Sequence, residues 1–256
     1  MLIKNQQLFH AARTGNIDLL QSVLSRGVDV NTRTDKGASA LHHAAYAGQV
    51  QAMEVLLHRR ADPAAVDQSN TQPIHWAIEG GRPESIDVLA RHGVDVRALH
   101  DDTRTIYAES PYGPIAPIHW AAIHGQASCV TGLLRLGASV DDPTDQQNTA
   151  LHFGVLHGSI EVVETLIAAG ADVRARTTYG DTPLHMLGNR NRDVVVTTQD
   201  TDTRMIDALL QAGADPLLVN KAGLRPCEQA DRALLAHIDQ HILHNEAQPM
   251  RRARRM

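Results

Sequence analysis

A repeat of 33 residues is the feature that most constrains the fold of this chain. The tetrapeptide Thr-Ala-Leu-His that ends at His152 has counterparts that end at His42, His75, His119 and His185, separated by gaps of 33, 44, 33 and 33 residues. Self-similarity at a fixed period of this length is typical of architectures in which each unit packs only on its neighbours. The longer gap is one period plus an insertion of eleven residues.

Each period contains two helical segments. In the copy at residues 149–169, a short apolar segment ends at Gly158, and a longer one follows with Ile160, Val163 and Ile167 at helical spacing. Neither helix can bury its apolar side alone, so each unit needs near-copies on both flanks.

A glycine ends the second helix of most copies. It is found at Gly27, Gly93, Gly137, Gly170 and Gly213, whereas Arg60 occupies this slot in the second copy. Either Arg60 adopts the left-handed conformation, at a cost of about 1–2 kcal/mol, or the turn differs there.

These residues resemble a known family. The tetrapeptides SALH, QPIH, APIH, TALH and TPLH resemble the T-P-L-H signature of ankyrin repeats, and the Gly-Ala-Asp endings at 170–172 and 213–215 are similar to the ends of such repeats. The resemblance covers residues 5–236. It implies an all-α fold with short hairpin turns, a solenoid of about seven helix-turn-helix units whose terminal units act as caps.

The resemblance also divides the chain. We expect a single solenoid over 1–245, with repeats at about 1–33, 34–66, 67–99, 111–143, 144–176, 177–219 and 220–245. Insertions at about 100–116 and 188–203 interrupt it, and a disordered basic tail at 246–256 follows it. The first insertion contains Ile106, Tyr107, Tyr112 and Ile115, and is either a tolerated surface loop or a binding finger.

Composition narrows the class of partner. Hydrophobic residues make up 43% of the chain but aromatic residues only 3%, which suits thin helix pairs packed through small aliphatic side chains. The net charge of −5 disfavours a general nucleic-acid or anionic-membrane surface. No apolar run reaches the ~18–20 residues of a membrane span, and the first residues lack the apolar core of a signal peptide.

We therefore expect a cytoplasmic protein, with export by a non-Sec route left open. Arginine outnumbers lysine by 21 to 3, which fits a GC-rich genome and leaves a secreted bacterial effector or adaptor as an alternative. We expect Cys129 and Cys227 on apolar helix faces about three repeats apart, too distant for a disulfide.

The fifteen histidines raise the question of a metal site. The tetrapeptide histidines form a ladder with rungs roughly 8–10 Å apart, whereas zinc ligands lie within ~2.1 Å of the ion. We expect this ladder to hydrogen-bond backbone between repeats. His237, His241 and His244 have a chelating spacing on the last helix, so a metal- or small-ligand-binding protein is the alternative function; the other interpretation is a polar cap surface.

No catalytic signature is present. The sequence contains no G-x-x-x-x-G-K-[ST], G-x-G-x-x-G, G-x-S-x-G or H-E-x-x-H motif. We interpret Asp200 and Asp202 as solvated loop charges. Trp76 and Trp120 each follow a tetrapeptide histidine, and packing between repeats is their expected role. The chain is predicted not to be an enzyme and to need no cofactor.

The resemblance implies a protein partner, because ankyrin-family proteins mostly bind proteins through hairpin tips and the exposed side of the first helices, which line a concave groove. Carried over position by position, the candidate partner-binding residues are Lys36, Tyr46, Glu79, Tyr107, Tyr112, Ile123, His124, Leu156, His157, Tyr179 and Arg190. Tyrosine and arginine are favoured at hot spots. Ile123, His124, Leu156 and His157 predict a groove centre that weakens at acid pH. We expect a monomer whose partner the sequence does not name.

Overall fold

The computed structural model describes residues 2–98, 114–188, 199–228 and 232–253. These residues are helical with short turns, and they include no β-strand apart from an isolated bridge between Arg33 and Ser39. The chain divides into two compact units, Met1–Asp145 (unit 1) and Gln146–Met256 (unit 2). The predicted all-α fold with short hairpin turns is confirmed.

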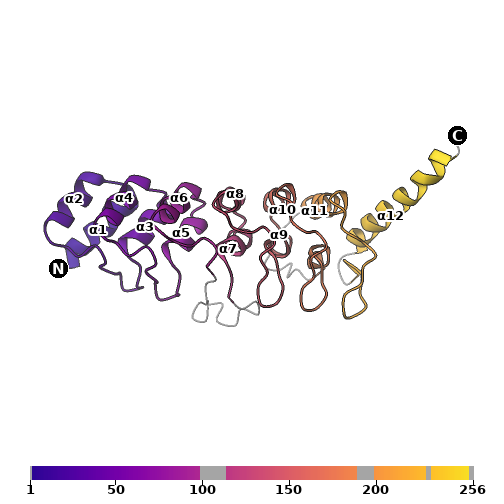
Figure 1. The fold of residues 1–256 in the computed structure, drawn as a ribbon, viewed down its shortest axis with the longest axis horizontal. Coiled ribbons are helices and arrows are strands. Elements are labelled where there is room, and N and C mark those ends of the chain that lie inside the picture. Colours follow the sequence, from indigo (N-terminus) through magenta and orange to yellow (C-terminus); the bar gives the residue numbers. More distant parts are fainter. Residues whose placement is uncertain (1, 99–113, 189–198, 229–231, 254–256) are drawn as a thin grey trace. The chain divides into compact units, whose positions relative to one another are not determined.

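The described residues of unit 1 form four helix pairs (Figure 1). The pairs are α1 (Leu2–Thr14) with α2 (Ile17–Ser25), α3 (Ala40–Ala47) with α4 (Val50–His58), α5 (Pro73–Glu79) with α6 (Pro83–Arg91), and α7 (Pro117–Ile123) with α8 (Ala127–Arg135). Each first helix packs on its own second helix, and α1, α3 and α5 also pack on the next first helix. The hairpin turns of the unit leave the helices on one side.

Unit 2 is less regular. Its elements are α9 (Ala150–His157), α10 (Ile160–Ala168), the 3₁₀ helix η1 (Pro183–Leu187), α11 (Gln199–Gln211) and α12 (Arg232–Ala253). The first helix of the sixth repeat is thus a short 3₁₀ segment. Helix α11 begins inside the predicted insertion at 188–203, and α12 continues into residues 246–253, where we expected disorder.

Small side chains let the first helices approach closely. Ala44, Ala45 and Ala77 are fully buried. A Cβ added to Gly80 at the end of α5 would lie 2.1 Å from the carbonyl oxygen of Tyr46 on α3. Aliphatic packing of this kind explains why so few aromatic residues suffice for the core.

The backbone conformation agrees with the sequence analysis at Gly158 and Arg60 and differs from it at Cys227. Gly158 ends α9 with a φ of 80°, and Arg60 adopts the left-handed conformation with a φ of 67°, as the first of its two alternatives required. Cys227 differs from the prediction because it lies in a turn, with a φ of 60°, and not on a helix face. Cys129 lies on α8, where burial raises the pKa of its thiol to about 11.

Candidate functional site

The tetrapeptide histidines hold consecutive repeats together through their backbone. Nδ1 of His42 accepts a hydrogen bond from the backbone N–H of Ser39 at 3.1 Å, so the proton is on Nε2, which donates to the carbonyl of Thr71 at 3.1 Å. His152 and His185 make the same pair of bonds, and their Nε2 atoms donate to the carbonyls of Asp181 (3.2 Å) and Leu224 (3.1 Å). The predicted inter-repeat ladder is confirmed at these positions.

Burial keeps the ladder neutral. Loss of solvation lowers the pKa of His42 and of His152 to about 4, although the hydrogen bond to the neighbouring carbonyl acts in the opposite direction. The pKa values of His119 and His185 are also lowered, mainly by burial. Both nitrogens of these rings are already engaged, so the ladder has a structural role.

Four ring side chains from three consecutive first helices form a connected group in unit 1. They are Phe9 on α1, His43 and Tyr46 on α3, and Trp76 on α5, and we refer to them as the aromatic row. The His43 ring lies 5.6 Å from that of Phe9 and 5.3 Å from that of Trp76, and the Tyr46 ring lies 6.2 Å from Trp76. The contacts of Trp76 with His43 and Tyr46 are edge-to-face, a favourable geometry for aromatic pairs, and the contact of Phe9 with His43 is tilted. Tyr46 is 49% exposed, so the aromatic row reaches the solvent at this residue.

The indole groups of the two tryptophans have different surroundings. Nε1 of Trp76 donates to a carboxylate oxygen of Asp67 at 3.1 Å and to Oγ1 of Thr71 at 3.0 Å. Trp120 is buried against His75, with ring centroids 5.4 Å apart, and its Nε1 has no hydrogen-bond partner of good geometry. The predicted packing of both tryptophans between repeats is confirmed, since His42 lies 5.3 Å from the Trp76 ring.

Two carboxylates adjoin the aromatic row. Asp67 accepts from the backbone N–H groups of Ser69 and Thr71, from the hydroxyl of Thr71 and from Trp76, all of which are neutral donors. Glu79 follows Trp76 by three residues on the same helix and is half-buried. Burial, and next the charge of Asp67, raise the pKa of Glu79, while the Trp120 indole acts in the opposite direction. The surface beside the aromatic row therefore carries carboxylate groups that are partly removed from water.

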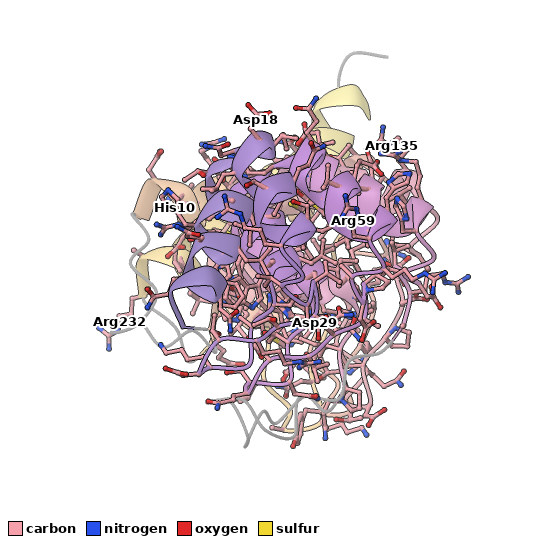
Figure 2. All side chains as sticks on the ribbon, turned by 90° about the vertical axis from the view of Figure 1, so that its left-hand side faces the viewer. His10, Asp18, Asp29, Arg59, Arg135 and Arg232 are labelled. Carbon is pink, nitrogen blue, oxygen red and sulfur yellow. The ribbon has the colours of Figure 1, made fainter. Side chains whose placement is uncertain are left out.

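The second helices carry a different chemistry. Ion pairs join successive helices. Glu54 on α4 pairs with Arg91 on α6 and with His92, which directly follows α6, and Asp87 on α6 pairs with Arg135 on α8. In the view of Figure 2, Asp18 and Arg135 lie near the outer edge of the molecule. Such exposed pairs contribute little each and describe a solvated surface.

The predicted binding residues are only partly brought together. Lys36 and Tyr46 are exposed in unit 1, Glu79 and Ile123 are half-buried there, and His124 packs its ring 5.1 Å from Trp120. In unit 2, Tyr179 is 68% exposed, and Leu156 and His157 are half-buried at the end of α9. Tyr107, Tyr112 and Arg190 lie outside the described residues. The predicted groove centre at Ile123, His124, Leu156 and His157 involves both units and stays a prediction.

Some expectations were wrong and some site residues were missed. Ile115 was expected in a surface insertion, either a tolerated loop or a binding finger, but it is 4% exposed, close to the start of α7. Asp202 belongs to α11 and is 2% exposed, so it is not a solvated loop charge. His43, Phe9 and Asp67 were not identified from the sequence. The signal was the recurrence of a ring at the position after the tetrapeptide histidine, in His43, Trp76 and Trp120.

The histidines of α12 do not form a metal centre with the neighbouring described groups. Nε2 of His237 is 2.8 Å from a carboxylate oxygen of Asp207 on α11. Among the side chains that the structure describes, no three His, Cys, Asp or Glu residues are arranged to hold a metal ion. The side chain of His244 is not among them.

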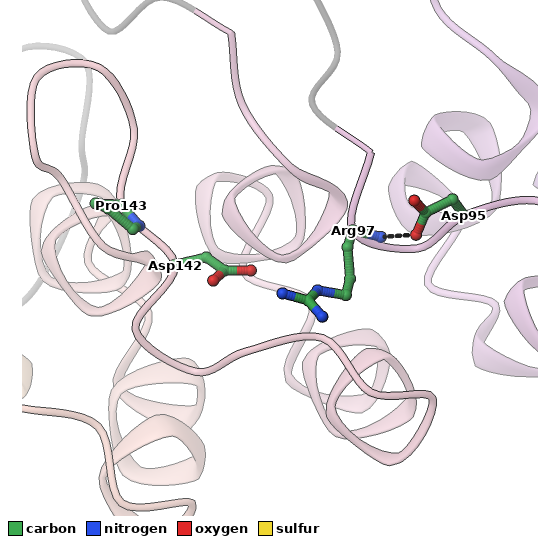
Figure 3. A pocket seen from close by; sticks show the side chains of 4 residues that line it. All are labelled: Asp95, Arg97, Asp142 and Pro143. Atoms are coloured by element: carbon green, nitrogen blue, oxygen red, sulfur yellow. Dashed lines mark hydrogen bonds between the residues drawn. The ribbon is translucent and has the colours of Figure 1, made fainter.

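A hollow of about 440 Å³ lies between two hairpins of unit 1, lined by Asp95, Arg97, Asp142 and Pro143 (Figure 3). The backbone N–H of Arg97 donates to Asp95 at 2.8 Å, and the side chains of Arg97 and Asp142 point toward each other. The hollow has few lining groups and no convergent catalytic set. In the described parts of the chain, no helix is long and apolar enough to cross a membrane.

Comparisons with known proteins agree with this architecture. The family model described as ankyrin repeats (3 copies) matches residues 8–100 and 109–177, more than half of the chain. The crystal structure of the human ASB11 ankyrin repeat domain superposes with a TM-score of 0.72 at 24% sequence identity, over 90% of this chain and 96% of that one. This likeness concerns the fold alone. No curated protein matches the sequence.

Proposed function

Since the chain belongs to the ankyrin-repeat family, whose repeats are generally protein–protein interaction modules, we propose that it is a non-catalytic scaffold that binds a partner protein. The partner contacts the first helices and the hairpin tips. The proposal includes a cytoplasmic location, which cell fractionation would test. It also includes a monomeric state, which light scattering would test.

The exposed aromatic row is the observation that carries this proposal. Tyr46 is 49% exposed and packs on Trp76, on the side of unit 1 where the first helices lie. Tyr179 is 68% exposed on a hairpin of unit 2. Large amphipathic rings at the surface are the groups that most often dominate binding energy. The second helices, in contrast, carry exposed ion pairs between neighbouring helices, such as Glu54 with Arg91 and Asp87 with Arg135.

The test is affinity capture from the native cell, with mass spectrometry of the recovered proteins. Replacing Tyr46, Tyr112 and Tyr179 together by alanine is expected to abolish recovery of the specific partner. A matched control replaces exposed residues of the second helices, Gln21, Gln51 and Glu161, by alanine, and should retain the partner. Equal recovery by both variants, with unchanged far-UV circular dichroism, would refute the site.

The metal alternative is not carried forward, because His237 is already paired with Asp207.

A further inference from the structure

The two carboxylates beside the aromatic row lack a positive partner. Among the residues that the structure describes, Asp67 and Glu79 form no ion pair with lysine, arginine or histidine, whereas Glu54 and Asp87 on the second helices do. The donors around Asp67 are all neutral. A half-buried carboxylate such as Glu79 is costly to keep charged without a cation nearby.

The rings around these carboxylates favour the same kind of ligand. Tyr46 and Trp76 come from neighbouring helices, and Trp76 and Glu79 are three residues apart on α5, so they share a helix face. Ring faces of tryptophan and tyrosine attract cations through their quadrupole, and the attraction grows when the cation is desolvated. A ring pair beside an unpaired carboxylate suits an ammonium or guanidinium group.

The hairpins of unit 1 carry further negative charge. The described segments that join consecutive repeats carry the aspartates Asp29, Asp35, Asp62, Asp67, Asp95, Asp141, Asp142 and Asp145, against the cations Arg26, Arg33, Lys36, Arg59, Arg60 and Arg97. Of these cations, Arg33 is committed to the carbonyl of Val66. An excess of one sign along a surface attracts and orients a partner of the other sign.

We propose that the partner presents a basic segment to unit 1 and places a lysine or arginine side chain on the Tyr46–Trp76 ring pair, within reach of Glu79. This inference rests on the proposed function and specifies the chemistry of its site. The hairpin aspartates steer the segment, and the carboxylate and the rings receive one of its cations. Arginine suits the site better than lysine because its planar guanidinium stacks on aromatic faces.

The experiment selects short peptides from a random display library on the full chain and measures the affinity of the recovered peptides by fluorescence anisotropy. We expect the peptides to be enriched in arginine and lysine and to lose affinity as salt is added. Glu79→Gln keeps the size of the side chain and should weaken binding about fivefold to tenfold. The matched control is Glu84→Gln, an exposed carboxylate on α6, which should change affinity less than about twofold.

A double-mutant cycle separates a direct contact from a general charge effect. Replacing the key basic residue of a selected peptide by norleucine should remove most of the difference between the parent chain and Glu79→Gln. Peptides that depend on Tyr46 but carry no basic residue, or that bind Glu79→Gln as well as the parent, would overturn this inference alone. If the chain selects no peptide at all, or only peptides indifferent to Tyr46, this inference and the proposed function both fail.

Discussion

Unit 1 keeps the 33-residue period through most of its length, whereas unit 2 accommodates an insertion inside a repeat. In unit 1 all four first helices are α-helical, but in unit 2 the segment before the second insertion is the five-residue 3₁₀ helix η1. The difference shows which part of the repeat tolerates change. The length of the first helix varies, while His42, His152 and His185 keep the bond from Nε2 to the equivalent carbonyl of the next repeat. His119 instead reaches the carbonyl of Asp142, 23 residues ahead.

The number of residues between each of these histidines and the carbonyl that it contacts supports this interpretation. His42 and His152 reach carbonyls 29 residues ahead, at Thr71 and Asp181. His185 reaches Leu224, 39 residues ahead, which is ten residues more than 29, and the carbonyl at the equivalent position is still met. A buried imidazole N–H without an acceptor would cost about 1–3 kcal/mol, so the chain preserves the bond rather than the spacing.

The strongest test of the comparison uses two glycines that each directly follow the first helix of a repeat. Gly80 follows α5 in unit 1 and Gly188 follows η1 in unit 2, both in the right-handed helical region. Gly80→Ala should destabilise unit 1 by about 3 kcal/mol, because its Cβ would lie 2.1 Å from the Tyr46 carbonyl oxygen and the helices must separate. Urea unfolding followed by tryptophan fluorescence reports on unit 1 alone, since Trp76 and Trp120 both belong to it.

Gly188→Ala is the control in unit 2. Its added Cβ would lie no closer than 3.4 Å to any atom, which is ordinary contact, so far-UV circular dichroism should show little change in the unfolding midpoint. Equal destabilisation by both substitutions would mean that the first helices of the two units are packed equally tightly.

The next test asks whether the histidine ladder stabilises both units equally. The pKa of His42 in unit 1 and of His152 in unit 2 is lowered to about 4 by burial. Because the folded pKa lies below the unfolded value, their stabilisation is full above about pH 6.5 and is lost as the pH falls toward 4. Each should contribute a loss of about 2 kcal/mol between pH 7.5 and pH 5, measured by urea unfolding.

Single substitutions assign this loss. His42→Gln should flatten the pH dependence of the tryptophan-detected transition, and His152→Gln should flatten that of the circular dichroism signal from unit 2. His10→Gln, at an exposed position on α1, should leave both profiles parallel to that of the parent. A profile unaffected by either ladder substitution would contradict the assigned role.

A third test compares the two tryptophans of unit 1. Trp76→Phe removes the donor to Asp67 and Thr71 and should cost about 1–2 kcal/mol, because a part-buried carboxylate loses a hydrogen bond. Trp120→Phe removes an indole N–H that has no such partner, so it should cost less than Trp76→Phe. Far-UV circular dichroism during urea unfolding measures both. The reverse order would mean that the Asp67 bond contributes little.

The fold was largely predictable and the site was not, for a physical reason. Helix periodicity and the tetrapeptide spacing are local or nearest-neighbour properties, and from them followed the helix pairs and the ladder at His42, while the left-handed Arg60 was one of two alternatives. The relation of Glu79 to Asp67 depends on side-chain rotamers and on desolvation, which a one-dimensional pattern does not contain. Burial of Asp202 was missed likewise, because the start of α11 had been placed too late.

The smallest expected effects concern the ion pairs of the second helices. In unit 1, Nη2 of Arg135 contacts both carboxylate oxygens of Asp87, at 2.6 and 2.5 Å, while in unit 2 Arg204 contacts one oxygen of Glu164 at 3.2 Å. The side chain of Asp87 is 30% exposed and that of Glu164 is 52% exposed, so solvent screens the second pair more. Arg135→Gln should destabilise unit 1 by about 0.5 kcal/mol and Arg204→Gln should destabilise unit 2 by about 0.2 kcal/mol, and high salt should remove both differences.

Urea unfolding at low and at high salt, with fluorescence for unit 1 and circular dichroism for unit 2, measures these two losses of stability. A larger loss at Arg204, or one that persists at high salt, would show that the regular spacing of unit 1 gives its surface pairs no advantage.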